Sequence, residues 1–207
     1  MFRSLWRTLL GLPLGLSLVS CVTIYPTDDL PEKLSAGKLD AVHVVFLCEG
    51  MMKDLGSSWD KRLQKDLHER NVVALRVGYF GDPLGVVFNW SSVAPGKRLA
   101  QLADDITEAH ERSGDPRPLH LDAVSFSHGG EVLLSAASRV KKARFRKWVT
   151  INSSSFAFSG ESGRWIEEGR VETIRNYWSP IDIMTLLAPL GCGSFGMRFG
   201  GPEVENR

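Results

Sequence analysis

The sequence predicts an α/β domain in which a mostly parallel sheet carries helices on both faces. Strand-like and helix-like segments alternate along most of the chain, as they do in proteins of this class. The run Ala41–Leu47 is almost wholly apolar, which is typical of a strand buried on both faces. A second strand signal, Leu119–Phe126, leads through a turn of small residues into a segment rich in Ala and Leu, and this order predicts a strand, a tight turn and a helix.

Each remaining element has its own signal in the sequence. Trp59, Leu63 and Leu67 recur every four residues and predict a helix from about Ser58 that ends at Asn71. Apolar runs predict the strands, and helical periodicity predicts the other helices. In chain order these are a strand over 72–77, a helix with its core face over 99–109, the strand over 119–126, a helix over 131–140, strands over 147–152 and 171–177, and a helix from about 179. The sequence then ends without the signal of a full closing strand and helix, so we expect the last strand and helix of the fold to be incomplete.

The charge balance and the spacing of polar residues exclude several classes of function. The chain carries Lys+Arg 25 against Asp+Glu 24, and so nothing suggests a nucleic-acid partner. The basic run Lys141–Arg146 is most simply a solvated helix end, with contact to a membrane surface as the alternative. Paired-cysteine and His-x-x-x-His spacings are absent, and we expect no metal and no cofactor. Cys48 and Cys192 are compatible either with a disulfide or with two free thiols.

The N-terminus has the features of an export signal. A basic start precedes an apolar stretch that is short for a permanent membrane span, so we expect residues 1–20 to be a signal peptide. Its end, Leu18-Val-Ser-Cys21, resembles the lipobox of bacterial lipoproteins, which implies a lipidated Cys21 and a bacterial envelope protein anchored to a membrane through acyl chains. The alternative is an ordinary cleaved signal with a chance cysteine. Residues 21–38 carry Pro, Gly and charge and predict a tether, followed by one domain over 39–207.

The turn after the 119–126 strand is the strongest candidate for a catalytic site. Ser125-Phe-Ser127-His-Gly129, with a strand before it and a helix after it, resembles the nucleophile elbow Gly-x-Ser-x-Gly of the α/β-hydrolase fold. Ser125 replaces the first glycine of that pattern. The resemblance covers most of residues 41–190 and implies a lipase- or esterase-like serine hydrolase with Ser127 as its nucleophile. The alternative is that Ser127 only starts or caps a helix.

The resemblance also implies where a developing oxyanion would be held. The segment Val44–Met51 is similar to the strand and His-Gly loop that open many lipases and esterases, with Glu49 in the place of the histidine. By this likeness the backbone N–H groups of Met51 and His128 are the oxyanion donors. Such donors typically contribute roughly 3–4 kcal/mol to transition-state stabilisation, and they do not depend on side-chain identity.

The sequence contains a candidate for the acid of a catalytic triad but no convincing candidate for its base. By the same resemblance Asp182, in a loop after the 171–177 strand, is the acid, although it fits equally well as a residue in the first turn of a helix. The family's order is Ser, then Asp or Glu, then His, but no histidine follows Ser127. The five histidines, of which none is a convincing base, are His43, His68, His110, His120 and His128.

These observations predict a membrane-anchored lipoprotein with a serine-hydrolase domain that acts on a small acyl or ester substrate. We expect its catalysis to be impaired, either because the gene is truncated or because the domain has lost catalysis and kept its cleft. The first alternative function is therefore a non-catalytic envelope protein that binds a ligand or partner in that cleft. The second is a doubly wound domain unrelated to hydrolases, which a buried Ser127 would indicate.

Overall fold

The structure is a computed structural model that describes residues 22–25, 30–36, 42–50, 59–79, 92–151, 161–177 and 204–206. Its elements, in chain order, are β1 (Val22–Tyr25), α2 (Leu30–Ser35), β2 (His43–Cys48), α3 (Trp59–His68), β3 (Val73–Tyr79), α5 (Val93–Ser113), β4 (His120–Phe126), α6 (Gly129–Ala137), β5 (Phe145–Ile151), α7 (Glu161–Glu167), β6 (Val171–Tyr177) and β7 (Val204–Asn206). All described strands form one sheet, ordered β1-β3-β2-β4-β5-β6-β7. Every pair is parallel except β1 with β3.

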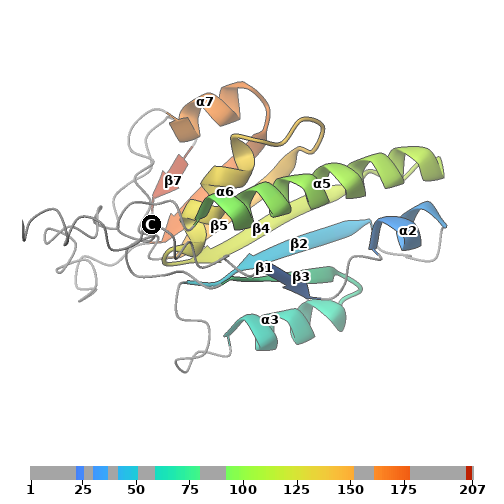
Figure 1. Ribbon diagram of the computed structural model, residues 1–207, viewed down its shortest axis with the longest axis horizontal. Coiled ribbons are helices and arrows are strands. Elements are labelled where there is room, and N and C mark those ends of the chain that lie inside the picture. Colours follow the sequence, from blue (N-terminus) through green and yellow to red (C-terminus); the bar gives the residue numbers. More distant parts are fainter. Residues whose placement is uncertain are drawn as a thin grey trace, which may run out of the picture.

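Helices cover both faces of this sheet, which confirms the predicted fold class. Helices α5 and α6 pack together on one face, and α3 lies on the other (Figure 1). Strand β2 is buried over its last five residues because both of its faces are covered, as its apolar run predicted. Asn71 ends the turn after α3 with φ 58°, a left-handed conformation that Asn tolerates better than most residues.

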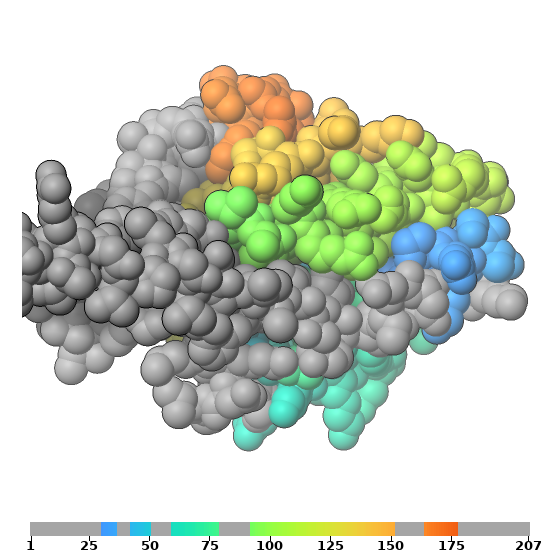
Figure 2. Space-filling view, viewed as in Figure 1, coloured from blue at the N-terminus to red at the C-terminus, as the bar shows by residue number. Residues whose placement is uncertain are grey.

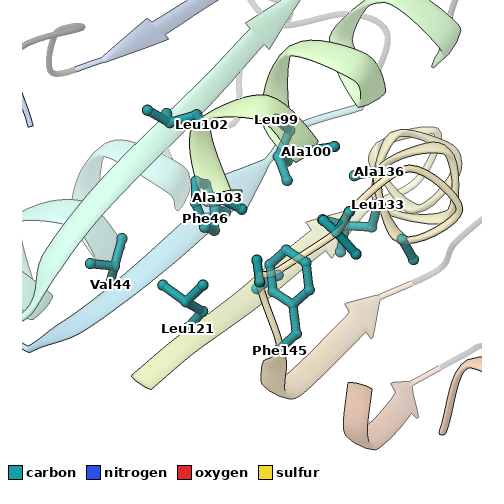
Figure 3. Close-up of a cluster of buried hydrophobic side chains, with 14 of the residues drawn as sticks. Val44, Phe46, Leu99, Ala100, Leu102, Ala103, Leu121, Leu133, Ala136 and Phe145 are labelled. Atoms are coloured by element: carbon teal, nitrogen blue, oxygen red, sulfur yellow. The ribbon is translucent and has the colours of Figure 1, made fainter. Parts of the chain in front are cut away.

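The main core lies between the sheet and the α5–α6 pair. Phe46 and Leu121 on the strands are buried against Leu99 and Leu133 on the helices (Figure 3). Small residues let these two helices approach closely, since a Cβ at Gly96 would lie 2.4 Å from the Ser135 side chain. A smaller core forms on the opposite face, where Trp59, Leu63 and Leu67 of α3 pack on the sheet, as their spacing predicted.

The segment predicted as a tether differs from that expectation. Residues 22–25 form β1, an edge strand of the sheet, and residues 30–35 form α2. Leu30 and Leu34 are buried in the main core, and α2 extends the surface formed by α5 (Figure 2). The four-residue spacing of these two leucines places both on one face of a short helix, and packing against α5 stabilises a helix too short to persist alone. The prediction of a tether was therefore wrong for residues 22–25 and 30–35, which belong to the described fold.

Two further elements had no clear signal in the sequence. Helix α7 contributes Trp165, which is buried against Trp148 with ring centroids 6.1 Å apart. Strand β7 pairs in parallel with β6, with Ile174 opposite Val204. It has only three residues, so the edge of the described sheet ends in a short strand.

Candidate active site

The candidate site lies where the parallel strands end. Because β2 to β6 all run in the same direction, their carboxyl ends meet at one edge of the sheet, here called the carboxyl edge. Ser127 follows β4 directly at this edge and is partly exposed, so it is not the buried serine that an unrelated doubly wound domain would show. Open α/β sheets place their ligands at this edge.

Ser127 has an unusual backbone conformation. Its φ is 51°, in the left-handed region that residues other than Gly, Asn and Asp rarely adopt. Its N–H donates to the Ile151 carbonyl at 3.0 Å, and its own carbonyl accepts from the Gly130 N–H at 3.1 Å. These bonds fix the turn between β4 and α6 on both sides. A strained serine on a strand-to-helix turn is the geometry that makes a nucleophile elbow project its hydroxyl from the sheet.

Glycines allow the neighbouring segments to approach this turn. A Cβ at Gly129 would lie 2.2 Å from the Cys48 carbonyl oxygen and 2.6 Å from that of Glu49. A Cβ at Gly50 would lie 3.1 Å from the Ser127 Cβ and 3.5 Å from its Oγ. The end of β2 therefore lies directly beside the serine, and the chain continues from Gly50 at the point where the resemblance expects an oxyanion loop.

Ser125, which departs from the glycine of the motif, fits this turn without strain. It does not share the positive φ of Ser127, so its position does not require glycine. Its side chain is fully buried, and its Oγ has no hydrogen-bond partner in the described part of the chain. The departure from the motif therefore leaves the backbone of the turn intact.

His128 follows Ser127 at the start of α6. Its ring is buried with 2% exposure, and burial lowers its pKa to about 4, so the imidazole is neutral at physiological pH. It occupies the N-cap position of α6, where the backbone N–H groups of the first turn lack partners within the helix. The position thus suits a backbone oxyanion donor.

A buried polar network lies on the opposite side of the β2 end. Asp60 of α3 is 1% exposed and accepts a hydrogen bond from the Arg76 guanidinium of β3. Burial raises the pKa of Asp60, but hydrogen bonds from the Glu49 carboxyl and from Arg76 outweigh it, and the net pKa lies below its usual value. The Glu49 side chain is itself buried, with 5% exposure. The network ties Glu49, the residue before Gly50, to α3 and β3.

Four of the five histidines lie away from the serine. His43 begins β2 and His120 begins β4, and the two are register partners at the amino edge of the sheet. His68 and His110 lie in the last turns of α3 and α5, helices that lead into β3 and β4 and therefore end near the same amino edge. A strand of six or seven residues separates that edge from Ser127 by about 20 Å. None of these four imidazoles reaches the Ser127 hydroxyl.

The structure also forms a polar cluster that the sequence did not indicate. The Asp122 carboxylate lies 2.7 Å from His43 Nε2 and accepts a hydrogen bond from Arg146 Nε at 3.0 Å. Burial raises the pKa of Asp122, but hydrogen bonds from Arg146 and His43 outweigh it and the net pKa is lowered. A His–Asp pair of this kind could be mistaken for part of a triad, but it belongs to the amino edge. Its members are distant in sequence, and only strand pairing brings them together.

Several predicted site residues lie outside the described part of the chain. These are Cys21, Met51, Asp182 and Cys192. Strand β6, which precedes Asp182 in sequence, occupies the second position from β4 and ends at the carboxyl edge. There the Thr150 hydroxyl donates to the Asn176 Oδ1 at 2.7 Å, a buried bond that ties β6 to β5. Cys48 is a free, fully buried thiol whose pKa is raised by burial.

The described part of the chain contains neither a cluster suited to a metal ion nor a helix able to span a membrane. Across the described ranges, no three His, Cys, Asp or Glu side chains come together in a way that could hold a metal ion. Among the helices described, none combines the length and apolar character needed to cross a bilayer.

Comparisons with known proteins give a distant structural likeness. No protein-family model matches the sequence, and no curated protein matches it. Among solved structures, a thermophilic esterase from the Planctomycetes species Thermogutta terrifontis, bound to butyrate, aligns at 15% identity and a TM-score of 0.41, covering 89% of this chain and 76% of its own. Its propionate-bound form gives the same identity and TM-score over 90% and 76%, and a form phosphoramylated by tabun aligns at 14% identity and a TM-score of 0.41 over the same shares. A superposition this loose transfers no residue role, and the assignment of the site rests on its own geometry.

Proposed function

We propose that this chain is a lipid-anchored protein of the bacterial envelope whose domain has the site of a serine hydrolase for carboxylic esters or related acyl compounds. Ser127 is the nucleophile and Asp182 the acid that would orient a base. The backbone N–H groups of Met51 and His128 are the oxyanion donors, and Cys21 carries the lipid. The observation that supports this proposal best is the left-handed Ser127, held between β4 and α6 with Gly50 and Gly129 beside it.

The chemistry proposed for this site is acyl transfer. The Ser127 Oγ attacks the ester carbonyl carbon, the carbonyl oxygen takes the negative charge, and the alcohol leaves with a proton from a general acid. The serine must lose its own proton to a base during the attack. No described histidine outside the elbow reaches it, and the His128 ring is buried with a low pKa. We therefore propose that hydrolysis by these 207 residues is impaired, by up to about a million-fold, as for enzymes that have lost a triad member.

Labelling with a fluorophosphonate tests the proposed nucleophile. The full chain, purified in detergent, is treated with the probe beside a Ser127→Ala variant of unchanged circular dichroism and unfolding midpoint. Labelling that disappears in the variant would establish an activated serine and imply a base outside the described residues. Equal labelling of both proteins would place the reactive group elsewhere and contradict the assignment of Ser127.

A second candidate function is the non-catalytic binding of an acyl compound at the carboxyl edge. The location of four histidines at the opposite edge favours it, because the site then keeps its shape without a base. It predicts no labelling of the folded protein together with saturable binding of a nonhydrolysable acyl ether. Turnover of an ester that is lost in Ser127→Ala would exclude it.

A further inference from the structure

Strand β1, the described strand nearest in sequence to Cys21, starts at the same height along the sheet as Ser127. Val22 of β1 pairs with Tyr79 at the carboxyl end of β3. Two residues earlier on β3, Val77 pairs with Cys48, which in turn pairs with Ser125. Tyr79 and Ser127 each lie two residues beyond that shared level. Val22 and Ser127 therefore lie at the same height on the carboxyl edge.

The lateral separation along this edge is also small. Strand β1 is separated from β4 by β3 and β2, so three strand spacings lie between them. At about 4.8 Å a spacing this is roughly 14 Å. Cys21 is bonded to Val22, and consecutive Cα atoms are about 3.8 Å apart. Acyl chains on Cys21 would thus be attached within about 20 Å of Ser127, on the same edge of the sheet.

A lipid at this position leaves the domain little freedom to turn away from the membrane. A flexible tether of the 18 residues first predicted would allow an end-to-end distance of about 23 Å. In the structure Val22 is already part of an antiparallel pair that continues to Tyr25 and Arg76. The residue after the proposed lipid is thus already paired in the sheet, so a lipid on Cys21 would hold the carboxyl edge near the membrane surface.

The other candidate for membrane contact lies at the opposite edge. The basic run Lys141–Arg146 leads into the amino end of β5. Part of its charge is already paired, since Lys142 Nζ lies 3.1 Å from Glu108 and Arg146 binds Asp122. An anchor at Val22 and a membrane contact through this run would require opposite orientations, and a covalent lipid outweighs a partly neutralised surface run.

We propose that the carboxyl edge faces the bilayer and that the site takes acyl esters held in that membrane, such as lipid esters, rather than freely diffusing ones. The inference rests on the proposed lipidation of Cys21 and the proposed role of Ser127. It gives the short connection between lipid and domain a function, which is to present Ser127 to substrate that does not leave the membrane.

Quenching of a fluorescent label by lipid tests the orientation. The mature full chain is reconstituted in phosphatidylcholine–phosphatidylglycerol vesicles containing a headgroup nitroxide lipid, after mass spectrometry of its N-terminus. One label is placed with Tyr177→Cys at the carboxyl edge and the other with Arg112→Cys near the amino edge, both in a Cys192→Ser background. Both positions are exposed: Tyr177 over 38% of its residue surface and Arg112 over 63% of its side-chain surface. They differ in height by about one strand length, roughly 20 Å, so we expect quenching at 177 to exceed that at 112 by about threefold.

The outcomes separate this inference from the proposed function. Equal quenching, or stronger quenching at 112, on a chain whose Cys21 is acylated would overturn the orientation and leave the anchor standing. An unmodified Cys21 would overturn the anchor and the inference with it. If Ser127 reacts with fluorophosphonates, a second comparison tests the substrate class. A long-chain fluorophosphonate placed in the same vesicles as the protein should react about tenfold faster than the same probe placed in separate vesicles, because the lipid anchor raises the concentration of probe around the site. Equal rates would show that the substrate need not share the membrane and would overturn the substrate class.

Discussion

Gly129 packs directly against the carbonyl of Cys48, so closely that a Cβ at Gly129 would lie 2.2 Å from the carbonyl oxygen. The contact joins the start of α6 to the end of β2 and determines how near the Ser127 turn comes to the Glu49–Gly50 segment. Both partners are buried, and neither backbone can retreat without moving its element.

Replacing Gly129 should therefore destabilise the protein by more than the change in backbone flexibility alone would. We expect Gly129→Ala to lower the free energy of unfolding by about 3 kcal/mol, because overpacking in a well-packed core is accommodated only by shifting backbone. Gly169→Ala is the matched control, since Gly169 has φ 66° but open space around it, and should cost only about 1 kcal/mol. Urea unfolding followed by circular dichroism measures both. Equal costs would show that the contact with Cys48 is not limiting.

The left-handed conformation of Ser127 should be visible as strain. We expect Ser127→Gly to be more stable than Ser127→Ala by about 1 kcal/mol, because glycine adopts φ 51° without the Cβ penalty. Asn71, with φ 58°, provides a control pair in Asn71→Gly and Asn71→Ala outside the site. Thermal unfolding of the four variants gives the two differences. A Ser127→Gly protein no more stable than Ser127→Ala would mean that the elbow is not strained.

The buried His128 should make the free energy of unfolding depend on pH between the pKa of its imidazole in the folded protein and that in the unfolded chain. In the unfolded chain the imidazole has a pKa near 6.5, and burial lowers it to about 4 in the folded protein. The unfolded state therefore binds more protons in this window, and the stability present above pH 6.5 is lost as the pH falls toward 4. The full effect is on the order of 3 kcal/mol, at about 1.4 kcal/mol per pKa unit.

A pair of substitutions isolates this contribution. Urea unfolding between pH 4 and 7 should lose part of its pH slope in His128→Gln, while His68→Gln, at an exposed helix end, should keep the slope of the parent protein. An unchanged slope in His128→Gln would show that another group titrates in that range.

The Asp60–Arg76 pair should matter more than an ion pair at the surface. Removal of one partner leaves a buried charge without compensation, so we expect Arg76→Met to cost about 3–5 kcal/mol at pH 7. The Lys65–Glu69 pair, 3.9 Å apart and largely exposed, is the control, and Lys65→Met should change stability by less than about 0.5 kcal/mol. Chemical denaturation measures both.

The acid side of the stability curve gives a second test of the same pair. Because the pKa of Asp60 is lowered in the folded state, its stabilisation is present above the unfolded pKa and is lost as the pH falls through the folded one. In Arg76→Met the pKa of Asp60 in the folded state rises toward or above its unfolded value, so the loss of stability in acid should be smaller than in the parent protein. Superimposable acid transitions would rule out a role for Arg76 in holding Asp60 ionised.

Much of the fold was predictable because its signals are local. The spacing of Trp59, Leu63 and Leu67 predicted the face that α3 buries, and Asn71 predicted where the segment ends. The order of strand, small turn and helix around Ser127 predicted the tight turn in which this residue has its left-handed conformation. These features depend on residues within a few positions of one another, and neighbouring side chains alone impose them.

Other features depended on partners far away in the chain. Strands β1 and β7 have four and three residues, too few for a recognisable pattern, and form because β3 and β6 offer free edges to pair with. The contact of Asp122 with His43 and Arg146 likewise needs three strands in one register.

The sequence by itself determined the fold class, the position of Ser127 after its strand and the lack of any later histidine, since these follow from the order of residues. Only the tertiary structure decided that Val22 lies level with Ser127 and that His43, His68, His110 and His120 lie near the opposite edge. The direction and register of each strand in a sheet come from pairing with other strands, and that pairing is long-range.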